Sequence, residues 1–346
     1  MKRLFSFILS CFLVVNVFAA DVFSPDLVSS KTAQYLYSAV TNPTVASVGG
    51  EWTVIGLAES SADIPDEYFD RYYKNVEEYV KSKNGILHSR KYTEYSRVIL
   101  ALTAIGRNPR NVAGYNLLMP LGDYKKTVQQ GINGAAWALI ALDSGEYAVP
   151  ENTSAEVPAT REMYIEHILQ RQNPDGGWAL GDAVSDVDVT AMCLRALAKY
   201  REREVVSLAC NGGITFLSKA QDENGGFSSW SMQNSESVMQ TIMALCALDI
   251  PLDDPRFVKN GNTLISALQR YISEDGAFLH TPKGGENLMA TEQGLLCFNA
   301  MRSAAEKKKK EENMLIPIVL NIGSIKEISV NCARLVQAFL NLTNAR

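Results

Sequence analysis

Carboxyl, amide and indole side chains gather at or just before the starts of the most apolar segments of this chain. A carboxylic acid held in an apolar cavity beside other carboxylates can stay protonated and give its proton to a substrate. Asp188, with Asp186 two residues before it, is the candidate for this chemistry. Aromatic rings beside a few converging polar groups also predict a small-molecule pocket. The candidate ligand-binding residues are Glu51, Trp52, Glu94, Arg97, Asn133, Trp137, Trp178, Thr190, Glu236, Gln240 and Glu292.

Helix capping is the competing interpretation of the same residues. Ser and Asp are preferred at the N-cap, where a side-chain oxygen accepts a hydrogen bond from the first turn. Ser185 or Asp186 could cap one helix, and Ser235 followed by Val238 could start another. Capping or pocket lining is favoured over proton donation for this set.

The apolar segments must form the elements that position these side chains. Each has apolar residues on nearly every side, which is typical of a helix buried all round. These segments are residues 52–59, 95–106, 135–142, 189–200, 238–250 and 290–301. One-sided amphipathic segments alternate with them, at residues 32–40, 66–81, 116–130, 161–172, 213–221 and 257–271. The alternation predicts two concentric layers of helices, with the apolar set inside, closed into a ring.

A turn motif recurs three times, at residues 170–178, 220–227 and 272–278, with a period of about fifty residues. Asp-Gly or Asn-Gly in each copy supplies the positive φ that ends a helix in a tight turn. An aromatic residue follows each turn, namely Trp178, Phe227 or Phe278, and is expected to pack back onto the helix end. The repeat predicts a helix–turn–helix unit used several times.

Gln172-x-x-Asp-Gly-Gly-Trp178, followed by an Ala-x-x-Leu helix, resembles the repeats of the terpenoid cyclase and protein prenyltransferase α/α-toroid superfamily. The likeness covers roughly residues 30–305 and is stronger to exported bacterial proteins of this kind. Residues 92–98, 111–118, 131–134, 186–192, 234–237 and 289–293 carry it. It implies an all-α, α6/α6 toroid of six helical hairpins with a central cavity.

The resemblance implies three possible activities. Residues 186–191 resemble the Asp-x-Asp-Asp-Thr-Ala stretch with which class II cyclases protonate an alkene or epoxide, and Asp188 matches the acid. Val189 stands where that pattern has another Asp, so one of the carboxyl groups that adjust the acidity of the proton donor is missing. Prenyltransferases need a zinc site of Asp, Cys and His, but no histidine here lies near a cysteine in that pattern, so no metal or other cofactor is predicted. Secreted corrinoid carriers use a related barrel with a closing β domain that this sequence lacks.

The two ends of the chain are expected to lie outside the toroid of residues 21–305. Met1-Lys2-Arg3 and the apolar residues 4–18 predict a signal peptide over residues 1–20, cleaved after Ala19 or Ala20. Secretion or display on the cell surface follows, and no later segment is apolar enough to span a membrane. Residues 306–313 read as a charged linker and 314–346 as a helical tail from an apparently truncated module.

The net charge of the chain limits the classes of partner that it could bind. The chain has 33 basic and 38 acidic residues, and removal of Lys2 and Arg3 leaves 31 minus 38, a net charge of −7. This balance excludes nucleic acid, whose binding needs a basic face. The sequence therefore favours non-catalytic binding of a small molecule, peptide or glycan in the cavity. A cyclase- or lyase-like enzyme that uses Asp188 as general acid is the alternative, and a corrinoid-binding barrel is the second.

Overall fold

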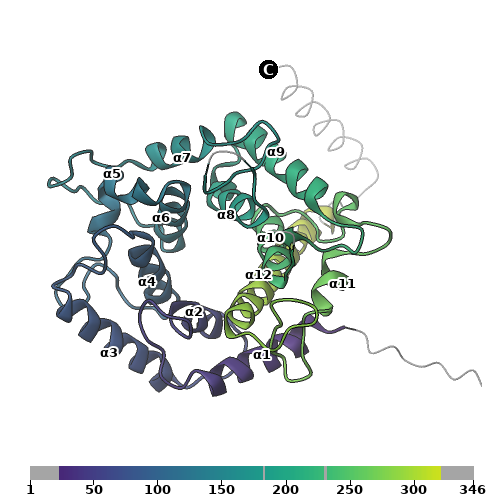
Figure 1. The fold of residues 1–346 in the computed structure, drawn as a ribbon, viewed down its shortest axis with the longest axis horizontal. Helices are drawn as coiled ribbons and strands as arrows, with labels where there is room; N and C mark the ends of the chain where they lie inside the picture. The colour runs from purple at the N-terminus through teal and green to yellow at the C-terminus, as the bar shows by residue number, and fades with distance from the viewer. Residues whose placement is uncertain (1–22, 182–183, 230–231, 321–346) are drawn as a thin grey trace, which may run out of the picture.

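The fold is seen in a computed structural model that describes residues 23–181, 184–229 and 232–320. The helices form a closed ring of two concentric layers, so the chain is an all-α, α/α toroid as the alternating segments predict (Figure 1). The signal peptide expected over residues 1–20 and most of the predicted tail, residues 321–346, lie outside the described residues.

The inner layer consists of the apolar helices. They are α2 (Glu51–Ala58), α4 (Thr93–Ala104), α6 (Ile132–Ser144), α8 (Val187–Leu197), α10 (Ser235–Ala247) and α12 (Leu288–Leu320). Small and aliphatic residues bury most of their surface, as on α6, where Ala135, Ala138 and Leu139 are fully buried. Such helices can be packed on several sides, which is why their apolar residues do not form a single stripe.

The outer layer consists of α1 (Pro25–Ala39), α3 (Asp66–Ser82), α5 (Tyr124–Thr127), α7 (Arg161–Leu169), α9 (Glu204–Ala220) and α11 (Leu264–Gln269). Short pieces complete the described elements: η1 (Met119–Gly122), η2 (Val128–Gln130), η3 (Ala198–Tyr200), η4 (Pro255–Phe257), β1 (Ser228–Ser229) and β2 (Met232–Gln233). The two strands pair antiparallel, with Ser228 opposite Gln233 and Ser229 opposite Met232.

Two outer helices are shorter than the sequence predicts. The stretch 116–130 divides into η1, α5 and η2, because Asp123 adopts an extended conformation and its side chain caps a new helix through the Lys126 N–H. The stretch 257–271 is helical only in α11 and at its first residue, because Asn260 and Gly261 have φ of 50° and 81° and form a tight turn.

Hydrogen bonds from the recurring turn connect each outer helix to the next outer element of the ring. In the first copy Gly176 has φ of 91°, and the Gln172 side chain donates to the carbonyls of Gly176 and Ala209, both at 2.7 Å. In the second, Gln221 donates to the carbonyls of Gly225 and Phe257 at 2.9 and 3.0 Å. Each glutamine therefore ties its own turn to the next outer element, a reason for its recurrence that spacing alone does not reveal.

The third turn closes the ring onto the first helix. The Thr32 hydroxyl of α1 donates to the Gly276 carbonyl at 2.7 Å, where the first two turns use glutamine. In the inner layer, Glu292 of α12 accepts from the Gly49 N–H at 2.9 Å and from the Thr53 hydroxyl at 2.6 Å. Asn299 of α12 donates to the Gly56 carbonyl at 2.8 Å. These buried bonds join the last repeat to the first.

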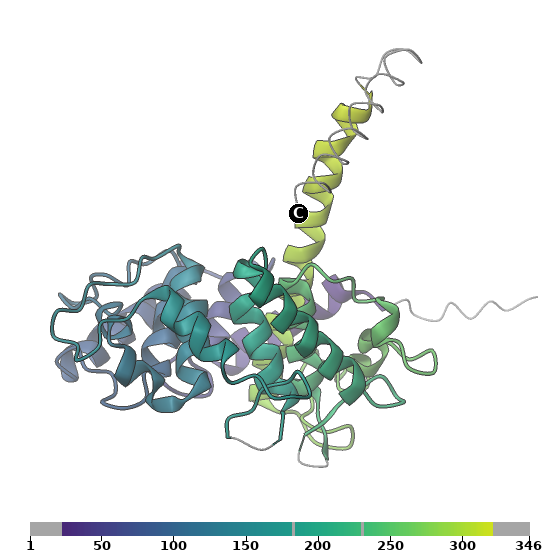
Figure 2. The same ribbon diagram turned by 90° about the horizontal axis from the view of Figure 1, so that it is seen from above.

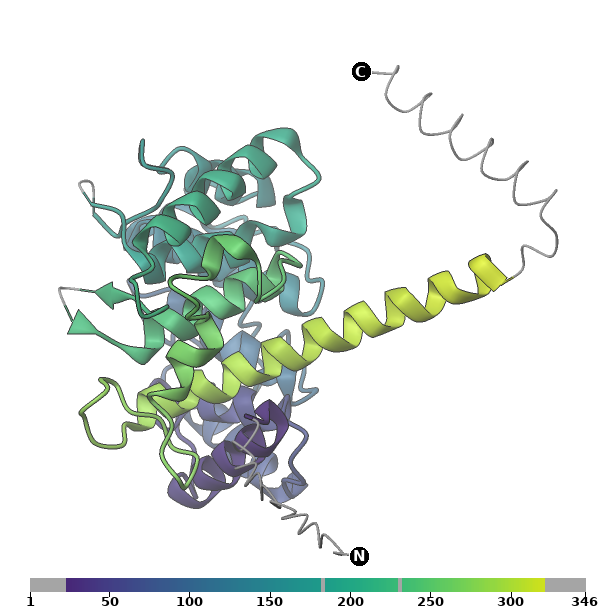
Figure 3. The same ribbon diagram turned by 90° about the vertical axis from the view of Figure 1, so that its right-hand side faces the viewer.

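The charged run 306–313 is a continuation of α12 and not a break in structure. Lys and Glu favour helix, so the run can extend a helix that is already nucleated in the ring. Its side chains are exposed. The distal part of α12 projects from one side of the ring (Figures 2 and 3).

Candidate functional site

Each inner helix presents a stripe of residues, three or four apart, to the lumen of the ring. On α8 the stripe is Asp188, Met192 and Arg195, and on α10 it includes Gln240 and Met243. Residues at this spacing lie on one face of a helix. The stripes enclose three adjoining hollows: a mouth cavity of about 1030 Å³, a central cavity of about 350 Å³ and a far cavity of about 690 Å³.

The cavities follow the direction of the inner helices. The mouth cavity includes Asn133 and Asp188 in first turns, and the far cavity includes Glu59 and Ser144 at helix ends. Trp137 lines all three cavities. The first turn of α8 and the last turn of α6 thus lie at opposite ends of one lumen.

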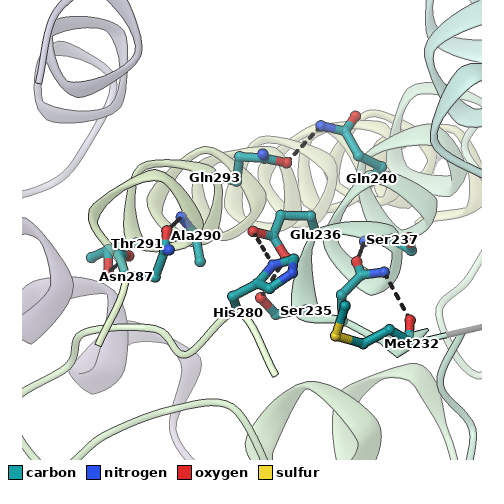
Figure 4. Close-up of polar contacts among 11 residues, drawn as sticks. Met232, Ser235, Glu236, Ser237, Gln240, His280, Asn287, Ala290, Thr291 and Gln293 are labelled. Atoms are coloured by element: carbon teal, nitrogen blue, oxygen red, sulfur yellow. Dashed lines mark hydrogen bonds and ion pairs between the residues drawn. The ribbon is translucent and has the colours of Figure 1, made fainter. Parts of the chain in front are cut away.

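Two indoles and a guanidinium form the middle of the lumen. The rings of Trp52 and Trp137 lie 5.2 Å apart at 46°, and the guanidinium carbon of Arg195 lies 5.8 Å from the Trp137 ring. An Arg195 N–H donates to Gln240 Oε1 at 3.3 Å, and Gln240 Nε2 donates to Gln293 Oε1 at 2.9 Å. The amide pair is visible in Figure 4. Aromatic faces beside one oriented cation can bind a ring that carries negative charge.

The two candidate acids have different environments. Asp186 is the N-cap of α8 and accepts from the N–H groups of Asp188 and Val189 at 2.9 and 3.0 Å. Asp188 does not cap the helix. Its Oδ1 is buried and finds no hydrogen-bond partner among the described residues, and the side chain lines the mouth cavity.

The pKa of Asp188 is raised to about 6. Burial is the main cause and the carboxyl groups of Asp186 and Glu236 add to it, while the Ser237 hydroxyl and His280 oppose the shift. Asp188 is therefore partly protonated near neutral pH, as a general acid must be. Asp186 caps α8 and Asp188 does not, although both residues line the mouth cavity.

Glu236 and His280 form a second polar pair on the mouth side (Figure 4). His280 Nδ1 lies 2.9 and 2.8 Å from the two carboxylate oxygens of Glu236, and the His280 side chain is 46% exposed. The carboxylate is mostly buried and also accepts from the Ser235 hydroxyl at 3.1 Å. Glu236 was a sequence candidate. Its partner lies 44 residues further along the chain, and nothing in their spacing indicates the pair.

Four predicted ligand-binding residues are buried structural groups instead. Trp178 is 0% exposed and donates from its indole to the Ile168 carbonyl at 2.8 Å. Thr190 is also fully buried, and its hydroxyl accepts from the Trp178 N–H at 2.9 Å. Glu292 closes the ring. Glu51 accepts from the Ala46 N–H at 2.7 Å, and burial raises its pKa.

The remaining candidates lie at the lumen or beside it. Trp52, Trp137 and Gln240 line it, as do Asn133 in the mouth cavity and Arg97 in the central cavity. Glu94 forms an ion pair with Arg97 at 2.8 Å. Arg97 therefore brings its own counter-ion, whereas Arg195 has none within 4.0 Å in the described part of the chain.

Arg195 and the far cavity are absent from the sequence candidates. Arg195 lies in the last turn of an otherwise apolar helix, far from the motif at its start. The far cavity is lined by charged groups, most of which have partners: Arg201 and Lys307 bind Asp249 at 2.9 and 2.7 Å, and the Lys199 ammonium donates to the Asp143 carbonyl at 2.7 Å. In the sequence, the charged residues near the ends of the inner helices are the signal that could indicate this cavity.

Nowhere in residues 23–181, 184–229 and 232–320 do three His, Cys, Asp or Glu side chains group as metal ligands would. Within the same ranges no helix combines the length and the apolarity needed to cross a membrane.

Comparison with known proteins supports the fold. The model of the prenyltransferase alpha-alpha toroid domain matches residues 117–230 and 192–308, which together span residues 117–308, more than half of the chain. This match confirms the resemblance expected from the repeated turns. A search of curated proteins finds no match. Among solved structures, an unsaturated glucuronyl hydrolase from Bacillus sp. GL1 is similar at 11% identity and a TM-score of 0.49, over 78% of this chain and 94% of that one. A likeness this distant says nothing about activity.

Proposed function

The chain belongs to the prenyltransferase α/α-toroid domain family, and from this premise we propose that it binds a small organic molecule in its lumen without altering it. The observation that carries the proposal is the group of Trp52, Trp137 and Arg195 at the centre of the ring. Two partly buried indoles offer flat apolar faces, and the guanidinium beside them fixes the orientation of a ligand.

The dimensions and composition of the lumen support this proposal. The central and far cavities hold about 350 and 690 Å³ and share Trp52, Trp137, Arg195, Met243 and Leu296. Cavities of roughly 300–1,000 Å³ with apolar walls and few polar groups are typical of small-molecule sites. A ring compound or one sugar unit of a glycan matches this space better than a folded partner does.

A thermal-shift screen tests the binding function. The panel contains corrinoids, isoprenoids, sterols, bile acids and cell-wall fragments, which also tests the corrinoid alternative. A ligand at a hundred times its dissociation constant stabilises the folded state by about 2.7 kcal/mol. Trp137→Leu should abolish the shift, and Lys74→Ala, on the exposed face of α3, should leave it unchanged. A hit that survives Trp137→Leu would contradict binding in the lumen.

Acid catalysis at the mouth is the second candidate function, and one observation favours it. Asp188 combines a pKa of about 6 with an oxygen that has no partner among the described residues and a position in the wall of the mouth cavity. A molecule bound there could take the proton from Asp188. Mass spectrometry of each hit after incubation would reveal turnover. Asp188→Asn should abolish it, whereas Glu78→Gln, on the exposed face of α3, should not.

Export to the cell surface or the medium is part of the proposal. It rests on the basic, apolar and small-residue order of residues 1–20. Intact-mass analysis of the protein from the cell exterior should give an N-terminus at Ala20 or Asp21. A protein that keeps Met1 and remains inside the cell would contradict this localisation.

A further inference from the structure

Arg195 has more hydrogen-bonding capacity than the protein uses. A guanidinium has five N–H donors. Only one bond to another side chain is found among the described residues, to Gln240 Oε1 at 3.3 Å, and the Trp137 face covers one side of the group. Arg97, the other arginine of the lumen, is instead bound to Glu94 at 2.8 Å.

The Arg195 side chain is partly buried and forms no ion pair with the described residues. Burial lowers the pKa of Arg195, although the Glu59 carboxylate and the Cys297 side chain act in the opposite direction. Arginine stays charged in proteins, so the cost of its partial desolvation is not relieved by loss of the proton. Buried charges are normally paired, and an anion that enters the cavity would supply the missing partner.

The two glutamines hold the guanidinium in a defined orientation. Gln240 can accept from Arg195 only with its oxygen turned toward α8, because its nitrogen donates to Gln293 of α12. This relay across α8, α10 and α12 fixes one N–H of Arg195, a residue that lines both the central and the far cavity. Arginine arranged in this way suits the two oxygens of a carboxylate.

The surrounding charges limit the anion to a single negative charge. Glu59 and Glu202 also line the far cavity, while Arg201 and Lys307 are bound to Asp249. The inner helices end at this cavity, and their C-terminal ends carry a partial negative charge. Lys199, the other cation of this cavity without an ion pair among the described residues, already donates to the Asp143 carbonyl. A second negative charge on the ligand would therefore be opposed by Glu59, Glu202 and the helix ends.

Building on the proposed function, we propose that the lumen selects ring compounds bearing one carboxylate, with the carboxylate on Arg195 and the ring against Trp52 and Trp137. The apolar part of the ligand gains contact with the indoles, and the carboxylate forms charge-assisted hydrogen bonds with the guanidinium. No group of this kind is assigned to the lumen by the family match.

The test uses three probes with one ring system: 2-naphthoate, its neutral amide 2-naphthamide and the dianion 2-naphthyl phosphate. Saturation-transfer NMR and titration with the full-length mature protein measure their affinities, at probe concentrations up to about 5 mM, where weak fragments are detected. Naphthoate should bind at least about tenfold tighter than the amide, the worth of one charge-assisted interaction. The phosphate should bind no tighter than naphthoate.

Variants separate this inference from the proposed function. Arg195→Gln should reduce naphthoate affinity to that of the amide, and Arg195→Lys should restore part of the difference because it keeps the charge without the planar fork. Arg203→Gln makes the same change on the outer face, where Arg203 binds Glu162, and should have no effect. Circular dichroism and a two-dimensional NMR spectrum confirm that each variant is folded.

Three outcomes would overturn the inference. Equal binding of acid and amide would leave a binding lumen but remove the carboxylate from it. Tighter binding of the phosphate would replace a monoanion site by a polyanion site. If no probe binds to the folded wild-type protein, the proposed function fails together with the inference.

Discussion

The two ends of the lumen differ in their charged side chains and in whether those side chains have partners within the protein. Acidic side chains surround the first turns of the inner helices, as Asp186, Asp188 and Glu236 do. At the far end, basic side chains such as Arg195 and Lys199 are mixed with acidic ones such as Glu59 and Glu202. The acids at the mouth and the bases at the far end complement the partial charges of the helix ends. At the mouth, however, most of these groups are already bound within the protein, whereas Arg195 has no ion-pair partner among the described residues.

The difference teaches that polar residues at helix starts are weak indicators of a site in a ring of helices. Asp186 caps α8, Thr190 accepts a buried N–H, and Glu292 joins the last repeat to the first. The Asp186 bonds satisfy donors that a helix start leaves without an intrahelical partner. The other two satisfy backbone donors of the turns that precede α8 and α2. Asp188, in the first turn of α8, and Arg195, in its last turn, are the lumen groups that keep unused hydrogen-bonding capacity among the described residues.

The largest expected effect is a difference in stability between variants of two tryptophans, one in the turn and one in the lumen. Trp178→Ala should lower the free energy of unfolding by about 3–5 kcal/mol, because removal of the fully buried ring leaves a cavity and also removes the indole hydrogen bond to the Ile168 carbonyl. Trp137→Ala should cost at most about 2 kcal/mol, because the ring faces open space on its lumen side. Urea denaturation of both variants, followed by circular dichroism, measures the difference. Equal losses would mean that the lumen tryptophan is as structural as the turn tryptophan.

A second test concerns a buried hydrogen bond between turn and inner helix that recurs in two repeats. The N–H of the aromatic residue after the turn donates to a threonine hydroxyl of the following inner helix: Trp178 to Thr190, and Phe278 to Thr291, both at 2.9 Å. Valine keeps the shape but removes the acceptor. Thr190→Val and Thr291→Val should each cost about 1–3 kcal/mol, the penalty of a buried unpaired donor.

Thr103→Val provides a matched control, since its hydroxyl lies near the end of α4 and is only partly buried. It should cost less than about 1 kcal/mol. The device is refuted if the two turn threonines tolerate valine as well as Thr103 does in the same denaturation experiment.

The sequence predicts the toroid well because the fold depends on patterns that are local and repeated. The apolar segments, the positive φ of Gly176, Gly225 and Gly276 and the aromatic after each turn are all present in the structure. The shorter outer helices were missed where an internal cap at Asp123 or the Asn260–Gly261 turn interrupts an amphipathic stretch. There the backbone signal prevails over periodicity.

The sequence predicts the lumen only in part because its contacts are distant along the chain. Trp52 and Trp137 were both candidates, but their 5.2 Å approach depends on ring closure. Because Trp178 and Thr190 flank a helix start, the sequence predicts that they line the cavity, but the turn folds both side chains into the core. Arg195 was missed because a lone cation in an apolar helix gives no motif, and its setting depends on Gln240 and Trp137 of other helices.

A third test uses pH to compare Asp188 with the capping acid beside it. Because the pKa of Asp188 is about 6 in the folded protein and about 3.8 in its ordinary state, the folded state binds the proton more tightly. Stability contributed by the protonated group is therefore lost as pH rises from about 4 through 6. Asp188→Asn should remove this loss and stabilise the protein at pH 7.5 by about 1–2 kcal/mol, allowing for partial hydration in the cavity.

Asp186→Asn is the matched change, and asparagine is also a good N-cap. It should alter stability by less than about 1 kcal/mol. Differences from wild type must be measured at each pH, because His167, whose pKa burial lowers to about 4, changes stability in the opposite direction over part of the same range. An Asp188→Asn variant that is less stable than wild type at pH 7.5 would show that the carboxylate is needed as an ion.

The smallest expected effect concerns the charges that surround the far cavity at its exposed edge. Lys307 of α12 binds Asp249 at 2.7 Å, but both side chains are substantially exposed, and Arg201 also binds Asp249. Exposed ion pairs contribute about 0–1 kcal/mol and are screened by salt. Lys307→Ala should therefore change the free energy of unfolding by less than about 0.5 kcal/mol, with a difference that shrinks in high salt. A loss above about 1 kcal/mol would mean that the charged groups at the far end stabilise the fold, as those at the mouth do. Arg195 would then differ from the charged groups at both ends of the lumen.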